Sequence, residues 1–169
     1  MTDLVKFRKQ KDAFFKSDPH SPLSQEQQRA FEGLNYYPEN LALRFDAEVE
    51  PFTDHMHVQM QTSTGDVQNY VKYGTFRFEV DDQPAVLTVY ASEDGGAFVP
   101  FADATSGPET YGAGRYLDLE HHGGNRFHVD FNLAYSPWCA YSPAFSCPIP
   151  PMENRLQVPI RAGEKNFGH

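Results

Sequence analysis

Side chains that could bind a ligand or catalyse a reaction are concentrated in the last third of the sequence, from Phe101 to Lys165. This stretch contains both cysteines, the only tryptophan, several prolines and many polar residues. A surface loop does not require such a mixture, so the composition predicts a built site here. The ligand-binding candidates are Asp103, Thr105, Tyr111, Arg115, Asp130, Asn132, Tyr135, Trp138, Tyr141, Glu153 and Asn154.

Two kinds of catalytic chemistry are open to residues of this stretch. Asp130 could form an acid/base pair with Glu109 or Glu153, because burial can separate the pKa values of two carboxyl groups. Cys139 could act as a nucleophile with His128 as its base. The catalytic candidates are therefore Asp130, Glu109, His128 and Cys139. The sequence lacks the nucleophile-elbow, zinc-protease and phosphate-loop motifs that would assign a reaction class.

Seven residues separate Cys139 from Cys147, a spacing that matches neither a C-x-x-C pair nor a zinc ribbon. Two buried free thiols are the simplest interpretation for a cytosolic protein, where disulfides are disfavoured. A disulfide or redox pair ranks second. A metal site in which His128 or His121 joins both thiolates ranks third, and the cysteine nucleophile ranks last.

A glycine-rich polar block precedes the cysteines and includes Glu109 and Arg115. Gly107, Gly112 and Gly114 allow positive φ and close approach of the backbone, so the block can form a tight loop that directs side chains inward. An arginine near carboxylates can either brace such a loop or bind an anionic substrate through its planar fork. The Gly-Ala-Gly sequence lacks the third glycine and the strand-to-helix setting of a dinucleotide-binding loop.

A predicted strand from Phe127 to Leu133 carries an apolar row on one face and a polar row on the other. The apolar row is Phe127, Val129, Phe131 and Leu133, and the polar row is His128, Asp130 and Asn132. The polar row is either a solvated sheet face or the lining of a cavity. A hairpin turn at 121–125 would pair this strand with 115–120 and bring Arg115 and Tyr116 close to the polar row. We adopt the cavity interpretation.

The elements that must position these residues begin with two predicted helices. Apolar residues at helical spacing, interrupted by Lys11, predict an amphipathic helix that ends near Asp18, because Pro19 disfavours helix at the preceding residue. Ser24 and Gln27 predict a capping box for a second helix, which we expect Gly33 to close.

From Leu41 onward the hydrophobic period changes from helical to two. Alternating residues predict strands over 41–49, 56–60, 76–80 and 87–89, with turns at 63–66, 81–84 and 93–96. Short strands separated by turns are typical of a barrel or sandwich. Prolines make the segment 134–154 irregular, and its apolar content predicts an ordered loop over one end of the barrel. A final strand is expected over 156–160.

Composition excludes several classes of protein. The 169 residues are 40% hydrophobic and 22% charged, as in an ordinary soluble globular protein. The net charge of -9 argues against nucleic-acid binding, which requires clustered Lys and Arg. The sequence has no apolar stretch of the roughly 18 residues that a membrane span needs. The charged N-terminal residues also do not fit a signal peptide, so we expect a cytoplasmic location. No cofactor or oligomeric state is indicated.

Several blocks resemble a bacterial and archaeal family of domains of unknown function. The blocks are FKSDPHSPL, YYPEN, YGTFRFEV, PFADATSGPETYGAGRYLDL and DFNLAYSPWCAYSPAFSCPIPPMENRLQVPIRAGEK. The resemblance covers nearly the whole chain and implies a single domain, with no activity to carry over. The family's characteristic polar positions include most of those singled out above, and they add Arg161 and Lys165.

The sequence therefore predicts a mainly β protein, an antiparallel barrel or sandwich with one or two N-terminal helices. Residues 1–34 would form the helical segment, and residues 41–169 the β domain with its proline-rich loop at 134–154. The favoured function is a small-molecule-binding protein or enzyme. Its polar pocket would have Arg115, Asp130 and Asn132 as its floor, and the loop that contains Trp138 and Tyr141 as its lid.

Two other functions stay open. In a non-catalytic interaction or structural domain, Glu153, Asn154, Arg161 and Lys165 would pair inside the molecule, and exposed aromatic residues would meet a partner. In a thiol-based metal or redox protein, Cys139 and Cys147 would lie close together. In the metal-binding form of this hypothesis, His128 would bind the metal together with the two thiolates.

Overall fold

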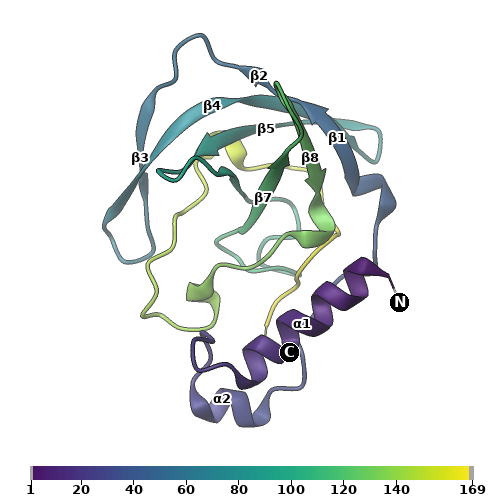
Figure 1. Cartoon of the computed structure of the whole chain (residues 1–169), viewed down its shortest axis with the longest axis vertical. Coiled ribbons are helices and arrows are strands. Elements are labelled where there is room, and N and C mark those ends of the chain that lie inside the picture. Colours follow the sequence, from purple (N-terminus) through teal and green to yellow (C-terminus); the bar gives the residue numbers. More distant parts are fainter. Residues whose placement is uncertain (1, 168–169) are drawn as a thin grey trace.

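The protein is a mainly antiparallel β-sheet rolled into a nearly closed barrel, with two helices at one end (Figure 1). The structure is a computed structural model that describes residues 2–167. The helices are α1 (Asp3–Ser17) and α2 (Gln25–Ala30), and no described helix is long and apolar enough to cross a membrane. The strands are β1 (Arg44–Glu48), β2 (Glu50–Pro51), β3 (His57–Gln61), β4 (Val67–Val80), β5 (Gln83–Ala91), β6 (Ala97–Phe101), β7 (Arg115–His121) and β8 (Arg126–Asp130). The predicted fold class is confirmed.

The barrel closes because the chain bends between β1 and β2. In the sheet order β1-β8-β7-β6-β5-β4-β2, β1 pairs with β8 at one edge and β2 pairs with β4 at the other. Val49 lies at the bend, and its N–H donates to the carbonyl of Asn125 at 2.8 Å. Gly74 of β4 lies beneath β2, where a Cβ would be 2.3 Å from the Glu50 carbonyl oxygen. Only glycine therefore allows β2 to approach β4 at this position.

Alternate residues of the strands fill the barrel, and a smaller apolar cluster attaches the helices. Leu87, Val99, Phe101, Val129 and Phe131 are fully buried members of the barrel core. The smaller cluster consists of Phe15, Leu23, Phe31, Leu34 and Tyr141. Because Tyr141 belongs to the proline-rich loop, the helices pack mainly on that loop rather than on the strands.

Two of the three predicted helix boundaries are confirmed. Thr2 caps α1 by accepting a hydrogen bond from the Val5 N–H at 3.2 Å, and α1 ends before Asp18 as expected. The capping box of α2 is present, with Ser24 and Gln27 each accepting from the backbone of the other. The prediction that Gly33 closes α2 was wrong, because α2 ends earlier so that Phe31 can enter the smaller apolar cluster.

The predicted strand over 127–133 is shorter than expected. Strand β8 ends at Asp130, and the next three residues form a turn of 3₁₀-helix, η2 (Phe131–Leu133). The Asp130 side chain causes this change by accepting a hydrogen bond from the Asn132 N–H at 3.0 Å. The predicted alternation therefore holds as far as Phe131, which is fully buried, and is reversed at the next two positions, with Asn132 2% exposed and Leu133 37% exposed.

Two further strand predictions need correction. The strand expected from Leu41 begins at Arg44, because Asn40 caps a 3₁₀ turn, η1 (Leu41–Leu43), by accepting from the Ala42 N–H. Residues 156–160 do not form a strand. They run beside residues 102–104 with only two main-chain hydrogen bonds to them, Leu156 N–H to Ala102 and Ala104 N–H to Val158. Pro159 lacks the N–H that a longer ladder would need.

Candidate functional site

The structure divides the predicted site residues into three groups, and the first is centred on Arg115. This residue begins β7 on the face that also carries Leu117 and Leu119, and it is fully buried. Its guanidinium donates through Nη1 to the carbonyls of Ala162 (2.5 Å) and Glu164 (3.1 Å), and through Nη2 to that of Ile160 (2.8 Å). Arg115 therefore binds the main chain of residues 160–164, which we call the C-terminal segment.

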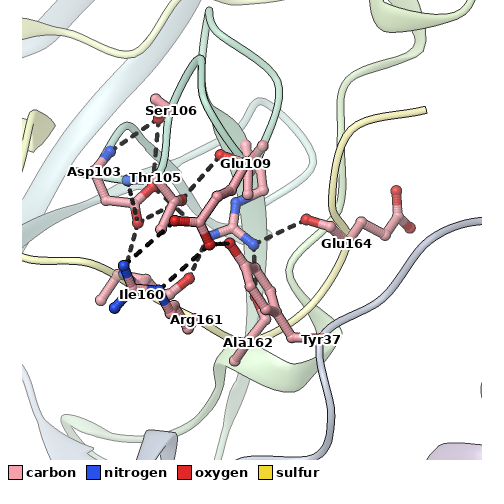
Figure 2. Close-up of polar contacts among 11 residues, drawn as sticks. Tyr37, Asp103, Thr105, Ser106, Glu109, Ile160, Arg161, Ala162 and Glu164 are labelled. Atoms are coloured by element: carbon pink, nitrogen blue, oxygen red, sulfur yellow. Dashed lines mark hydrogen bonds and ion pairs between the residues drawn. The ribbon is translucent and has the colours of Figure 1, made fainter. Parts of the chain in front are cut away.

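Asp103 also binds the C-terminal segment, through Ile160 (Figure 2). Its Oδ2 accepts from the Ile160 N–H at 2.6 Å and from the Thr105 hydroxyl at 2.8 Å, and its Oδ1 accepts from Ser106 at 3.3 Å. The same carboxylate lies 3.7 Å from Nη2 of Arg115, and both side chains are fully buried. Burial lowers the pKa of the Arg115 guanidinium, and the Asp103 carboxylate opposes that shift.

The first group reaches the surface at Glu109. Its carboxylate accepts from the Tyr37 hydroxyl at 2.7 Å and from two guanidinium nitrogens of Arg161 at 3.3 Å each. The Tyr37 hydrogen bond, followed by Arg161, lowers the pKa of Glu109. Burial, and after it the hydrogen bond to Glu109, raises the pKa of Tyr37 to about 12. Lys165 lies over the Tyr37 ring, 5.2 Å from its centroid.

The second group is centred on Asp130, at the opposite end of the β7–β8 hairpin from its turn. Arg44 donates through Nε to Asp130 at 3.0 Å and through Nη2 to Glu39 at 2.7 Å. Asn132 donates to Asp130 at 2.9 Å and exchanges two hydrogen bonds with the backbone of Asn40. Two blocks that the sequence placed far apart, YYPEN and DFNLAY, therefore meet here.

A cleft of about 560 Å³ opens beside the second group. It lies between the first two turns of α1 and the end of β8, and it is lined by Thr2, Asp3, Leu4, Phe7, Glu39, Arg44, Asp130 and Leu133. Three of these residues are acids and one is an arginine. Of the four catalytic candidates, Asp130 lines this cleft, whereas Glu109 lines a separate groove beside Lys165.

The third group contains the two cysteines and Tyr111. The Cys139 N–H lies 3.2 Å from the Cys147 sulfur, and the Tyr111 hydroxyl lies 3.7 Å from the Cys139 sulfur. Both cysteines are free thiols. The histidines that we considered as metal ligands take other partners, His128 with Asp46 at 3.0 Å and His121 with the Gly124 carbonyl. In residues 2–167, no set of three His, Cys, Asp or Glu is arranged to hold a metal.

The remaining predicted residues lie outside these three groups. Trp138 stacks on Phe14 of α1 at 6.4 Å, and Tyr141 packs edge-on against Phe15 at 5.1 Å. The predicted lid thus contacts the helices. Tyr135 donates a hydrogen bond to Asp118 at 2.9 Å. Glu153 accepts from Tyr90 and pairs with Lys72 at 3.2 Å. Asn154 exchanges hydrogen bonds of 2.8 and 2.9 Å with the backbone of Thr88 and donates to the Pro100 carbonyl at 2.9 Å.

Sequence reasoning missed an ion pair between Lys11 of α1 and Glu164 of the C-terminal segment. The pair is largely buried, with side chains 18% and 4% exposed. Glu164 also accepts from the Ser136 N–H at 3.1 Å and from the Tyr141 hydroxyl at 3.0 Å. The signal was present, since Lys11 is the polar residue that interrupts the apolar face of α1. A buried lysine at such a position requires an acidic partner.

Comparisons with known proteins give a family and a fold but no activity. The profile of a family described as "Protein of unknown function (DUF1684)" matches residues 29–165. An uncharacterised protein from gene locus rrnAC0354 of Haloarcula marismortui, solved by solution NMR, has 36% sequence identity to this chain. Its structure superposes with a TM-score of 0.73 over 98% of this chain and 94% of its own. No curated protein matches the chain.

Proposed function

The chain belongs to the DUF1684 family of proteins of unknown function, and we propose that it is a small-molecule-binding protein whose ligand occupies the cleft beside Asp130. One observation supports this proposal most directly. The group around Asp130 lines a cleft of about 560 Å³, within the range of known ligand pockets, about 300–1,000 Å³, and the groove beside Glu109 is smaller, at about 470 Å³. The Arg115 group instead directs its hydrogen bonds to the protein's own main chain.

The lining of the cleft favours an organic cation that carries an apolar portion. Asp3, Glu39 and Asp130 outnumber Arg44, so the cleft has an excess of negative charge. Phe7 and Leu133 are 42% and 37% exposed and supply apolar walls. A ligand amine could pair with a carboxylate at the base, while its apolar part contacts these walls.

Two of the three acidic groups of the cleft, Asp130 and Glu39, are held in place before any ligand arrives. Asp130 is fixed by Arg44 and by two hydrogen bonds from Asn132, and Arg44 also fixes Glu39. The hydrogen bonds from Arg44, first to Glu39 and then to Asp130, raise the pKa of the Arg44 guanidinium. Fixed groups lose little conformational entropy when they bind a ligand, which favours affinity.

The test is an NMR titration with phenethylamine, an aromatic primary amine, and with phenylacetate as the matched anion. We expect saturable shifts of backbone resonances in 3–7, 39–44 and 130–133 with the amine only. Asp130→Asn should weaken the binding roughly tenfold or more, because it removes a charge-assisted hydrogen bond. Phe7→Ala, at an exposed position, should weaken it without affecting the fold.

The control is Glu79→Gln, which removes one carboxylate from an exposed position of β4, away from the cleft. It should leave the amine affinity unchanged. Equal shifts with the amine and the anion, or shifts confined to other parts of the barrel, would contradict the proposal. Unchanged affinity in both Asp130→Asn and Phe7→Ala would contradict it as well.

A second candidate function is a non-catalytic interaction or structural domain. It is favoured by the partners that Glu153, Asn154 and Arg161 already have within the chain, which engage these polar groups of the C-terminal third without a ligand. Apolar side chains for a partner are available in Met152 and Leu41, which are 83% and 69% exposed. This function predicts no saturable shift at the cleft with any charged probe, so the same titration separates the two candidates.

A further inference from the structure

The two thiols are close in space and embedded in the proline-rich loop. Cys139 lies in a 3₁₀ turn, η3 (Trp138–Ala140), and its N–H contacts the Cys147 sulfur at 3.2 Å. A contact of this length places the Cys147 sulfur against the main chain of Cys139. Disulfide formation requires Cβ atoms about 3.5–4.5 Å apart, a distance that the backbone sets, and rotation about the Cα–Cβ bonds then brings the two sulfurs together.

Cys147 is the more rigidly held of the two residues. Its N–H donates to the Ser63 hydroxyl at 3.1 Å, and its carbonyl accepts from the Ser63 N–H at 3.0 Å. Ile149 N–H donates to the Gln61 carbonyl at 2.8 Å just beyond it. Cys147 is therefore fastened to the end of the β3–β4 hairpin, whereas Cys139 belongs to the part of the loop that contacts α1 through Trp138.

The two sulfurs differ in exposure and in their neighbours, as is required if one thiol reacts with an oxidant before the other. Cys147 is 7% exposed, and burial raises the pKa of its thiol to about 11. Cys139 is more exposed, and the Tyr111 hydroxyl lies 3.7 Å from its sulfur. A phenol can donate a hydrogen bond to a thiolate and stabilise it. Cys139 is thus the accessible nucleophile, and Cys147 is the protected thiol behind it.

We propose that Cys139 and Cys147 form a redox-active dithiol that is oxidised to an intramolecular disulfide by low-molecular-weight disulfides. Three geometric observations support this inference: the contact between the two cysteines, the unequal exposure of their sulfurs, and the Tyr111 hydroxyl beside Cys139. The inference is independent of ligand binding at the cleft.

The reaction proceeds by two thiol–disulfide exchanges. The Cys139 thiolate attacks one sulfur of R–S–S–R, so a Cys139–S–S–R bond forms and one R–S⁻ leaves. Cys147 then loses its proton to solvent and attacks the Cys139 sulfur, which forms the Cys139–Cys147 bond and expels the second R–S⁻. Two protein thiols are oxidised and one small disulfide is reduced to two R–SH, which take up the two released protons.

The expected consequence is a firmer connection between α1 and the barrel. A bond between Cys139 and Cys147 closes a loop of nine residues. This removes conformational freedom from the unfolded chain and should raise the Tm by roughly 5–10 °C. The loop contains Tyr141, which packs on Phe15, so oxidation should strengthen that contact most.

The experiment treats the full chain with an excess of oxidised glutathione and measures thiol content, mass and Tm. We expect both thiols to disappear, the mass to fall by that of two hydrogen atoms, and the Tm to rise, with dithiothreitol reversing all three changes. Cys147→Ser should stop the reaction at one stable glutathionyl adduct on Cys139. Cys139→Ser should react at least roughly tenfold more slowly, since only the buried thiol is left.

Tyr111→Phe serves as a conservative variant that keeps both cysteines. It should slow the first exchange and leave the final disulfide unchanged, since it removes only the hydroxyl beside Cys139. Three outcomes would overturn the inference: thiols that stay reduced in excess oxidised glutathione, a glutathionyl adduct that persists in the unmodified sequence, or disulfides that join two chains. Serine is close to cysteine in size, so both serine variants should fold.

Discussion

Two polar groups in this protein have the same core, an arginine paired with an aspartate, yet they differ in what the arginine binds. Arg115 is fully buried and donates to three main-chain carbonyls of the C-terminal segment. Arg44 is 29% exposed and donates to two carboxylates, those of Asp130 and Glu39. The first group binds the protein's own backbone, and the second lines an open cleft. Identical residue types therefore brace the fold in one place and can receive a ligand in the other.

The largest effect that tests this comparison is expected for Arg115→Met. The substitution leaves three carbonyls and the Asp103 carboxylate buried without their partner, so it should destabilise the protein by about 3–5 kcal/mol. Urea unfolding followed by circular dichroism would measure the loss. A loss below about 1 kcal/mol would show that the C-terminal segment does not depend on the guanidinium.

The next effect concerns the C-terminal segment itself. Gly163 has a φ of +82°, and a Cβ there would lie 2.6 Å from the Ala134 carbonyl oxygen. Gly163→Ala should therefore lower the free energy of unfolding by about 1–3 kcal/mol. We expect the upper end of this range because the added Cβ would clash with backbone atoms. Gly107→Ala is the matched control, because Gly107 also has a positive φ (+101°) but a Cβ there would meet no atom within 4 Å. If both substitutions lower the free energy of unfolding by urea equally, the close packing of the C-terminal segment around Gly163 does not contribute to stability.

A smaller effect is expected for Arg44→Met. Asp130 keeps its hydrogen bonds from Asn132, and the arginine is partly solvated, so the loss should be about 1 kcal/mol or less. The affinity of the cleft for an amine should increase, because the competing cation is gone. A loss as large as that of Arg115→Met would remove the distinction between the two groups.

The smallest effect is a change in the pH dependence of stability at the exposed end of the Arg115 group. The pKa of Glu109 is lowered in the folded protein, so its contribution is present above about 4.5 and disappears as the pH falls through the folded value. The pKa of Tyr37 is raised from 10.0 to about 12, so its contribution is present below 10 and is lost as the pH rises through 12.

Tyr37→Phe removes the hydrogen bond that contributes to both shifts. It should lower the free energy of unfolding at neutral pH, where both contributions are present, and thereby flatten its dependence on pH in the acidic and alkaline windows. Urea unfolding at a series of pH values would measure this. Superimposable profiles for the two proteins would mean that the hydrogen bond does not contribute to stability.

Local patterns predicted the parts of the fold that depend on neighbouring residues. The turn at 81–84 and the capping box of α2 are decided within a few positions, and both were predicted. In the structure Arg115 shares a face of β7 with Leu117 and Leu119 and is fully buried, whereas we predicted it in the floor of a polar pocket. The sequence could not show its partners, because the carbonyls that it binds lie 45–49 residues further along the chain.

The predicted site residues fall into separate groups in the structure because their partners are also distant in the sequence. Asp130 and Asn132 were predicted on one polar face, but the Asp130 side chain ends β8 and turns Asn132 toward Asn40. A period-two pattern contains no signal for that interruption. Asn132 in turn binds the backbone of Asn40, next to Glu39, so the cleft could be located only once the tertiary structure was known.

The dependence of Arg115 on residues 160–164 also has a consequence for the order of events during translation. A growing chain exposes β7 well before the C-terminal segment has been made, and until then the guanidinium keeps its hydration. The barrel cannot enclose that arginine without its carbonyl partners. We therefore expect the nascent chain to stay open at this end, in need of protection from aggregation, until residues 160–164 have left the ribosome.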